Sequence, residues 1–215
     1  MNLRIALPLC LSCLLLLGGC ATSRSVLDIP PPAAKAAQPA ADKEVLITSL
    51  SDKRLFEANP SSPDIPSLDP DEGQSAAIKA RAVGRKRNSF GKALGDILLK
   101  EGQSVETLTA ASIRQAFVEK GYKVIERKEQ ATKNTVFVEA AVDKFWSWMN
   151  PGFASITLST EIATELSIKS AEKNATKTVS VKASDNYQTG MEENWIEVIN
   201  KALRAYVDEL RAKLE

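Results

Sequence analysis

The chain has 215 residues, with 28 lysines and arginines against 27 aspartates and glutamates, so its formal net charge is +1. This near-neutral balance does not favour nucleic acid as a partner. The chain contains no histidine, and its three cysteines are Cys10, Cys13 and Cys20. Imidazole bases, thiolate nucleophiles and His/Cys metal sites are therefore excluded after residue 20, and we expect neither a metal nor a cofactor.

The first nineteen residues have the pattern of a cleaved leader. Arg4 precedes an uncharged apolar segment that runs from Ile5 to Leu17. A segment of about thirteen residues is short for a bilayer, which needs roughly 20, but it is typical of a secretory signal peptide. We therefore expect residues 1–19 to be removed as a signal peptide.

The end of this leader, Leu17-Gly18-Gly19-Cys20, resembles the bacterial lipobox. By that resemblance Cys20 would carry a diacylglyceryl group and an acyl chain such as palmitate. Several chains on one residue would hold the protein permanently at a bilayer. Ala21 stands where lipoproteins retained in the inner membrane often carry aspartate, so we expect an outer-membrane anchor facing the periplasm. The alternative is an ordinary leader that happens to precede a cysteine.

Residues 20–43 are predicted to form the lipidated cysteine and a flexible tether. This stretch consists mainly of proline, alanine, serine and glutamine, including Pro30-Pro31-Pro32. Such a composition is too poor in large apolar residues to pack on its own. The remainder, residues 44–215, has room for one domain with its own core.

The first half of this domain opens with an apolar run at 44–50, typical of a buried strand. Residues 57–74 hold four prolines and are predicted to be a loop. A weaker strand is predicted over 76–85. From Ser104, which is placed to cap a helix, apolar residues recur at helical spacing until Gly121.

The second half predicts an antiparallel meander followed by a helix. Apolar residues alternate with polar ones over 136–142, 156–168 and 179–183, as expected of strands with one buried face. A wide apolar stripe marks a helix over 195–214. The order of elements predicts an α+β fold, a two-layer sandwich in which two helices cover one face of a mixed, mostly antiparallel sheet.

An aromatic cluster at residues 145–153 is the first candidate site. Consecutive strand residues point to opposite faces, so the two faces of this segment cannot enter a single core. Some aromatic area should then be exposed as a partner or membrane contact, with these candidate residues: Trp146, Trp148, Met149 and Phe153. The alternative is that a helix or the proline loop covers them.

Basic residues near the first strand form the second candidate, a patch for anions or an acidic partner: Lys53, Arg54, Arg85, Lys86 and Arg87. Solvated loop charges are the favoured alternative. The neighbouring Asp52 is interpreted as an aspartate that caps a turn rather than as a catalytic group.

The whole chain resembles the YajG-like bacterial lipoproteins, some of which carry a flagellar label. The resemblance is carried by the lipobox and by short motifs: Leu50-Ser51-Asp52-Lys53-Arg54, Arg85-Lys86-Arg87-Asn88-Ser89-Phe90-Gly91 and Gly121-Tyr122-Lys123-Val124. It implies an envelope lipoprotein and supplies no active-site residues.

Together these features predict a protein that is not an enzyme. We expect a non-catalytic binding or accessory component of an envelope assembly, held at the membrane by Cys20 and contacting an envelope protein. The alternative is an accessory lipoprotein that handles lipid or lipopolysaccharide for a transport system. A deep apolar cavity between sheet and helices would favour lipid handling, whereas a filled core with an exposed aromatic tip would favour protein partners.

Overall fold

The computed structural model describes residues 23–32, 43–73 and 75–214. The predicted signal peptide, the lipobox and residues 33–42 of the predicted tether lie outside these ranges. The elements follow in this order: β1 (Ser25–Leu27), β2 (Glu44–Asp52), α1 (Ala76–Arg81), β3 (Ala82–Arg87), β4 (Ala93–Leu99), α2 (Val105–Glu119), β5 (Lys123–Val124), a 3-10 turn (Lys128–Gln130), β6 (Thr135–Pro151), β7 (Ile156–Lys169), β8 (Asn174–Tyr187) and α3 (Glu192–Lys213).

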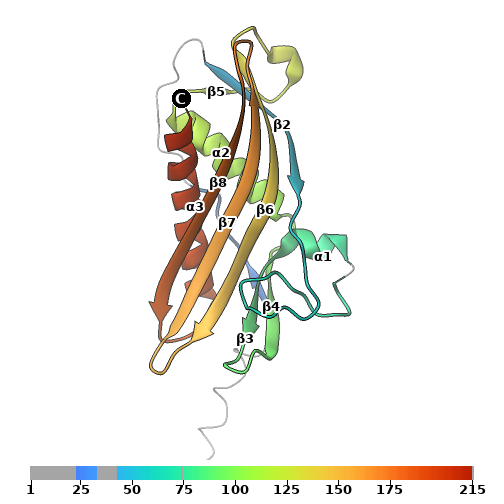
Figure 1. Cartoon of the computed structure of the whole chain (residues 1–215), viewed down its shortest axis with the longest axis vertical. Coiled ribbons are helices and arrows are strands. Elements are labelled where there is room, and N and C mark those ends of the chain that lie inside the picture. Colours follow the sequence, from blue (N-terminus) through green and yellow to red (C-terminus); the bar gives the residue numbers. More distant parts are fainter. Residues whose placement is uncertain (1–22, 33–42, 74, 215) are drawn as a thin grey trace, which may run out of the picture.

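Within the described ranges, eight strands form one mixed sheet built around β6. One edge of β6 pairs in parallel with β2 and then, near its end, with β3. The other edge pairs with β7 in antiparallel fashion, and β7 pairs likewise with β8. The predicted meander is confirmed, and Figure 1 shows its three long strands running along the length of the molecule.

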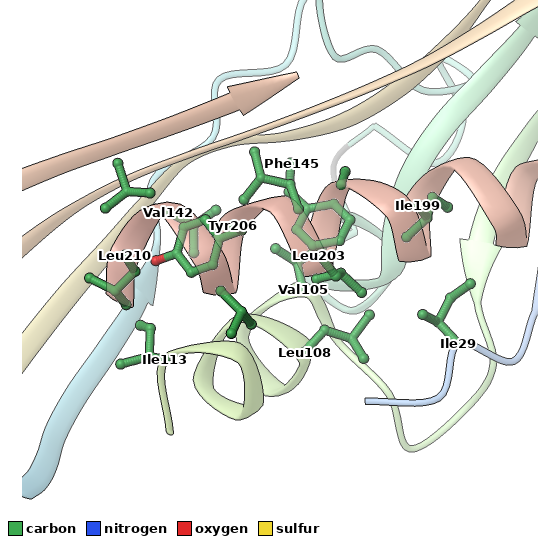
Figure 2. Packing of buried hydrophobic residues seen from close by; sticks show 14 of the residues in the cluster. Ile29, Val105, Leu108, Ile113, Val142, Phe145, Ile199, Leu203, Tyr206 and Leu210 are labelled. Atoms are coloured by element: carbon green, nitrogen blue, oxygen red, sulfur yellow. The ribbon is translucent and has the colours of Figure 1, made fainter. Parts of the chain in front are cut away.

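Helices α2 and α3 pack against one face of this sheet (Figure 1). Their apolar stripes share one buried cluster with the strands, and the largest side chains in it include Trp195, Tyr206, Phe117 and Phe145. Figure 2 shows Leu203 and Leu210 of α3 in this cluster with Leu108 and Ile113 of α2. The predicted α+β class, with two long helices on one face of a mixed sheet, is confirmed.

The ends of α2 follow from its sequence. The Ser104 hydroxyl accepts a hydrogen bond from the Thr107 amide (3.1 Å), and the Thr107 hydroxyl accepts one from the Ser104 amide (2.9 Å). This reciprocal pair satisfies two amides that the first turn leaves without helical partners. Gly121, with φ of 89°, then ends the helix in the left-handed region.

The N-terminal segment differs from the expected tether. Ser25–Leu27 forms β1, which pairs in parallel with β4, and Leu27 and Ile29 are buried in the main core. The Ile29 amide and carbonyl also exchange hydrogen bonds with the side chain of Gln103 (3.1 and 2.7 Å). Alternating burial from Ser25 to Ile29 makes this segment a strand of the domain rather than a linker.

The weak strand predicted over 76–85 is wrong in its first half. Ala76–Arg81 forms the short helix α1, and the strand β3 starts only at Ala82. Ser75 explains the difference, because its hydroxyl accepts a hydrogen bond from the Ile78 amide (3.3 Å) and so caps the helix.

Candidate functional site

The aromatic pair of β6 lies beneath the proline-rich loop. Trp146 and Trp148 are only 0% and 4% exposed and form a second buried cluster on the sheet face opposite α2 and α3, with Leu68, Ala82 and Leu98. The Trp146 indole donates to the Pro63 carbonyl (3.1 Å). The expectation that these rings are exposed is therefore wrong. The proline-rich loop packs against Trp146, as the alternative interpretation required, and the ammonium groups of Lys144 and Lys182 lie over the Trp148 ring.

Both faces of this part of β6 are buried, one under the loop and the other in the main core. Phe145 belongs to the main core, and Ser147 lies on that side with its hydroxyl 2.8 Å from the Thr160 hydroxyl. One strand thus serves two separate cores. Met149 is half-buried, and only Phe153, in the turn between β6 and β7, is fully exposed.

Arg54 fills a gap in the sheet. Strand β2 leaves β6 after Asp52, opposite Val142, and β3 joins β6 only at Gly84, opposite Ser147. The buried guanidinium donates to the carbonyl oxygens of Lys79 (2.6 Å), Ala82 (2.5 Å) and Phe145 (3.0 Å) and to both carboxylate oxygens of Asp52 (2.7 and 2.9 Å). These hydrogen bonds of Arg54 hold β2 and β3 against β6.

Asp52 has the capping role predicted for it. Besides the Arg54 guanidinium, its carboxylate accepts a hydrogen bond from the Arg54 amide (3.1 Å), which closes the turn after β2. The neighbouring Lys53 is exposed.

The other basic residues also have internal partners. Arg85 is buried beside Asp96, with 3.2 Å between Nε and Oδ1, and Lys86 Nζ donates to the Ser25 hydroxyl (2.8 Å). Arg87 donates to the Ser67 hydroxyl (2.8 Å). Burial raises the pKa of the Asp96 carboxyl, against the opposing effect of the Arg85 charge. These cations join the loop, β1 and β3, so the structure does not assemble the predicted anion patch.

One end of the molecule gathers exposed apolar side chains from three connections. Phe90, in the β3–β4 turn, is 93% exposed; Phe153, in the β6–β7 turn, is 110% exposed; Met191, just before α3, is 56% exposed. We call these three residues the apolar end, and the hairpins that carry the two phenylalanines lie at the bottom of Figure 1. A cleft of about 320 Å³ lies between the two turns, with Asn88 and Pro151 among its lining residues.

A second cleft, of about 400 Å³, lies between α2 and α3 and is closed on one side by Pro30–Pro32; we call it the helix cleft. Leu203 and Val207 contribute apolar side chains that are almost fully buried. The polar side chains around them are Gln115, Glu119, Asn200, Arg204 and Asp208. Arg211 binds Glu119 at 2.6 Å and so fixes one of these groups. An apolar floor with a few placed polar groups is typical of a binding cleft.

The family model described as uncharacterized lipoprotein matches residues 83–212, which is more than half of the chain. The chain belongs to this lipoprotein family. The match spans β3 to α3 and thus both long helices and the meander. No curated protein matches the lipoprotein.

Solved structures align with the lipoprotein to different extents. A crystal structure of an uncharacterized protein aligns with a TM-score of 0.52 at 8% identity, over 90% of this chain and 99% of that one, which shows a shared fold alone. A protein from Xanthomonas campestris aligns with a TM-score of 0.43 at 15% identity (85% and 91% covered). A minor lipoprotein from Acinetobacter baumannii gives 0.32 at 11% identity (48% and 81% covered).

Two further observations concern the described part of the lipoprotein. None of its helices is long and apolar enough to cross a membrane. Its Asp and Glu side chains form no group of three that could hold a metal ion. Membership of the lipoprotein family fits a lipid-anchored envelope protein.

Sequence reasoning missed the helix cleft and two residues of the apolar end. Phe90 had a local signal, since Asn88 precedes it in a turn: the Asn88 side-chain oxygen accepts from the amides of Phe90 (3.0 Å) and Lys92 (2.9 Å). Because such a turn lies at the protein surface, a phenylalanine within it is exposed to solvent. The helix cleft had no local signal, because its walls are far apart in the sequence.

Proposed function

We propose that this lipoprotein is a non-catalytic accessory component of an envelope assembly, anchored in the outer membrane through Cys20 and facing the periplasm. The helix cleft is the observation that carries the proposal. It offers an apolar floor and a polar rim to a segment of a partner protein. Family membership and the lipobox support the anchor, and the short motifs around Arg54 and Arg87 support a narrower kinship with the YajG-like lipoproteins.

We favour a protein partner over lipid handling because of how the core is filled. Trp195, Tyr206, Phe117 and Phe145 occupy the space between sheet and helices, where a lipid chain would need a deep apolar cavity. Four of the five basic side chains predicted to suit lipopolysaccharide phosphates, all but Lys53, have partners inside the fold.

The anchor is tested by substituting Cys20→Ala in the full-length chain, with Cys13→Ala in the leader as the matched control. Without the thiol that would carry the diacylglyceryl group, the Cys20 variant should leave the outer-membrane fraction on a density gradient. The control should stay there. A Cys20→Ala protein that still sediments with outer membranes would contradict the anchor.

A further inference from the structure

The N-terminal segment leads toward the apolar end. Because β1 is parallel to β4, with Ser25 opposite Ile97, both strands begin at the same end of the sheet. β4 begins just after the turn that carries Phe90. The backbone of Ser23 lies against Gly95, where an added Cβ would sit 2.6 Å from the Ser23 carbonyl.

The span between Cys20 and the folded domain is consequently short. Cys20 precedes Ser23 by three residues, and three residues of fully extended chain span at most about 11 Å. A lipid on Cys20 would therefore bring this end of the domain to the membrane surface. A flexible tether over residues 20–43, as the composition suggested, would have imposed no such orientation.

The two phenylalanines reach the same level at this end. In the parallel pair of β3 and β6, Arg85 lies opposite Trp148. Phe90 follows Arg85 by five residues and Phe153 follows Trp148 by five residues, so both turns extend beyond the same rung. The two turns therefore lie near one plane at this end of the molecule and not on different sides of it.

The connection before α3 completes the apolar end. Tyr187, the last residue of β8, lies opposite Ile156, the first residue of β7. Gly190 lies against the side chains of Ile156 and Met149, within 3.9 Å of an ideal Cβ. The exposed Met191 therefore lies beside the turn that carries Phe153.

We propose that the apolar end rests on the bilayer that holds the lipid of Cys20, with Phe90 and Phe153 inserted among the headgroups. This inference depends on the lipidation proposed above. Exposed apolar residues gathered at one end mark an interaction surface, and side chains such as Phe enter the interface in proteins that lie on a membrane. The short span from Cys20 selects the bilayer over a second copy or a protein partner as the occupant.

Site-specific labelling of the lipidated, full-length protein tests this orientation. Lipidation blocks the thiol of Cys20, so Ser89→Cys or Ala154→Cys introduces a unique exposed thiol beside each phenylalanine. Ser180→Cys is the matched control: it is exposed on β8, seven residues before Tyr187 and thus about 23 Å along the strand. Each variant carries an environment-sensitive dye in vesicles of phosphatidylethanolamine and phosphatidylglycerol.

Spin-labelled lipids with a shallow nitroxide should quench the dyes at positions 89 and 154 about twofold and leave position 180 unchanged. Combining Phe90→Ser with Phe153→Ser should weaken the quenching at position 154, because the rings no longer enter the headgroups, whereas Leu55→Ser, at an exposed residue outside the apolar end, should leave it unchanged.

Three outcomes would overturn the inference in distinguishable ways. Vesicle-bound protein with positions 89 and 154 no more quenched than position 180 would refute the orientation and leave the anchor intact. If the fluorescence at position 154 changes with the amount of protein per vesicle and not with the amount of spin-labelled lipid, the apolar end contacts a second copy of the protein. Protein that does not float with vesicles would refute the lipidation, and the orientation with it.

Discussion

The buried guanidinium of Arg54 stabilises a part of β6 that neither β2 nor β3 reaches. Its removal would take the guanidinium donors away from three carbonyl oxygens and from the Asp52 carboxylate, which would keep the hydrogen bond from the amide of residue 54. Breaking a buried, hydrogen-bonded charge in this way costs about 3 kcal/mol or more.

We therefore expect Arg54→Met to lower the free energy of unfolding by about 3 kcal/mol in urea titration. The matched control is Lys53→Met at the exposed neighbouring position, which should leave the midpoint nearly unchanged. Equal midpoints for the two variants would show that Arg54 is not the bridge between β2 and β3.

Tyr206 makes the free energy of unfolding depend on pH in the alkaline range. Burial raises the pKa of its phenol above the ordinary value of 10, although the hydroxyl of Thr164, 2.7 Å away, acts in the opposite direction. Because the folded state holds the proton more tightly than the unfolded state, this contribution to stability is complete below pH 10 and is lost as the pH rises toward the folded pKa.

At pH 11 the loss from Tyr206 should be about 1.4 kcal/mol relative to pH 9. The variant Tyr206→Phe should be less stable at pH 9, through the lost hydrogen bond, but should show a flatter decline between pH 9 and 11. Burial also raises the pKa of Tyr187, to about 12, so part of the decline should persist. Parallel declines in wild type and variant would contradict the assignment.

At the scale of elements, β1 turns the segment after the lipobox into part of the fold. Leu27→Ala should destabilise the protein by about 3 kcal/mol, because it removes a fully buried side chain from the main core. Val26→Ala is the control, since Val26 is half exposed on the other face of the same strand. If both variants unfold at the same urea concentration, β1 does not contribute to the core.

Elements with strong local patterns could be predicted from the sequence. The capping residue Ser104, the apolar stripes of both helices and the alternation of the meander are local signals, and each produced the expected element. β1 was missed because Val26 is apolar but exposed, which hides the alternation, and because its partner β4 lies about seventy residues away.

The candidate sites depend on contacts that no local pattern specifies. The sequence predicts correctly that Trp146 and Phe145 point to opposite faces of β6, but the loop at 53–70 covers the second face. Arg54 of this loop donates to the Ala82 carbonyl of β3, and Ser67 of the loop accepts a hydrogen bond from Arg87, although both charges look like a surface patch in the sequence. The helix cleft combines Pro30–Pro32 with two helices that begin more than seventy residues later.

For the whole molecule, contact of the apolar end with the bilayer would fix the distance between the membrane surface and the helix cleft. α3 begins beside the apolar end, and Arg204 on the rim of the cleft lies twelve residues into it, which places the rim about 18 Å along the helix axis. A partner in the periplasm could reach the cleft there while the lipid holds the protein in the membrane.

Photo-crosslinking in intact cells from a photoreactive residue at position 204 tests partner binding most directly. We expect a discrete protein adduct that is reduced when Asn200→Arg narrows the cleft in the same chain. Position 165 is the control, because Glu165 is exposed on the sheet face opposite the helices. If position 204 yields no discrete protein adduct, or yields the same adducts as position 165, the helix cleft does not bind a partner and the proposed function is wrong.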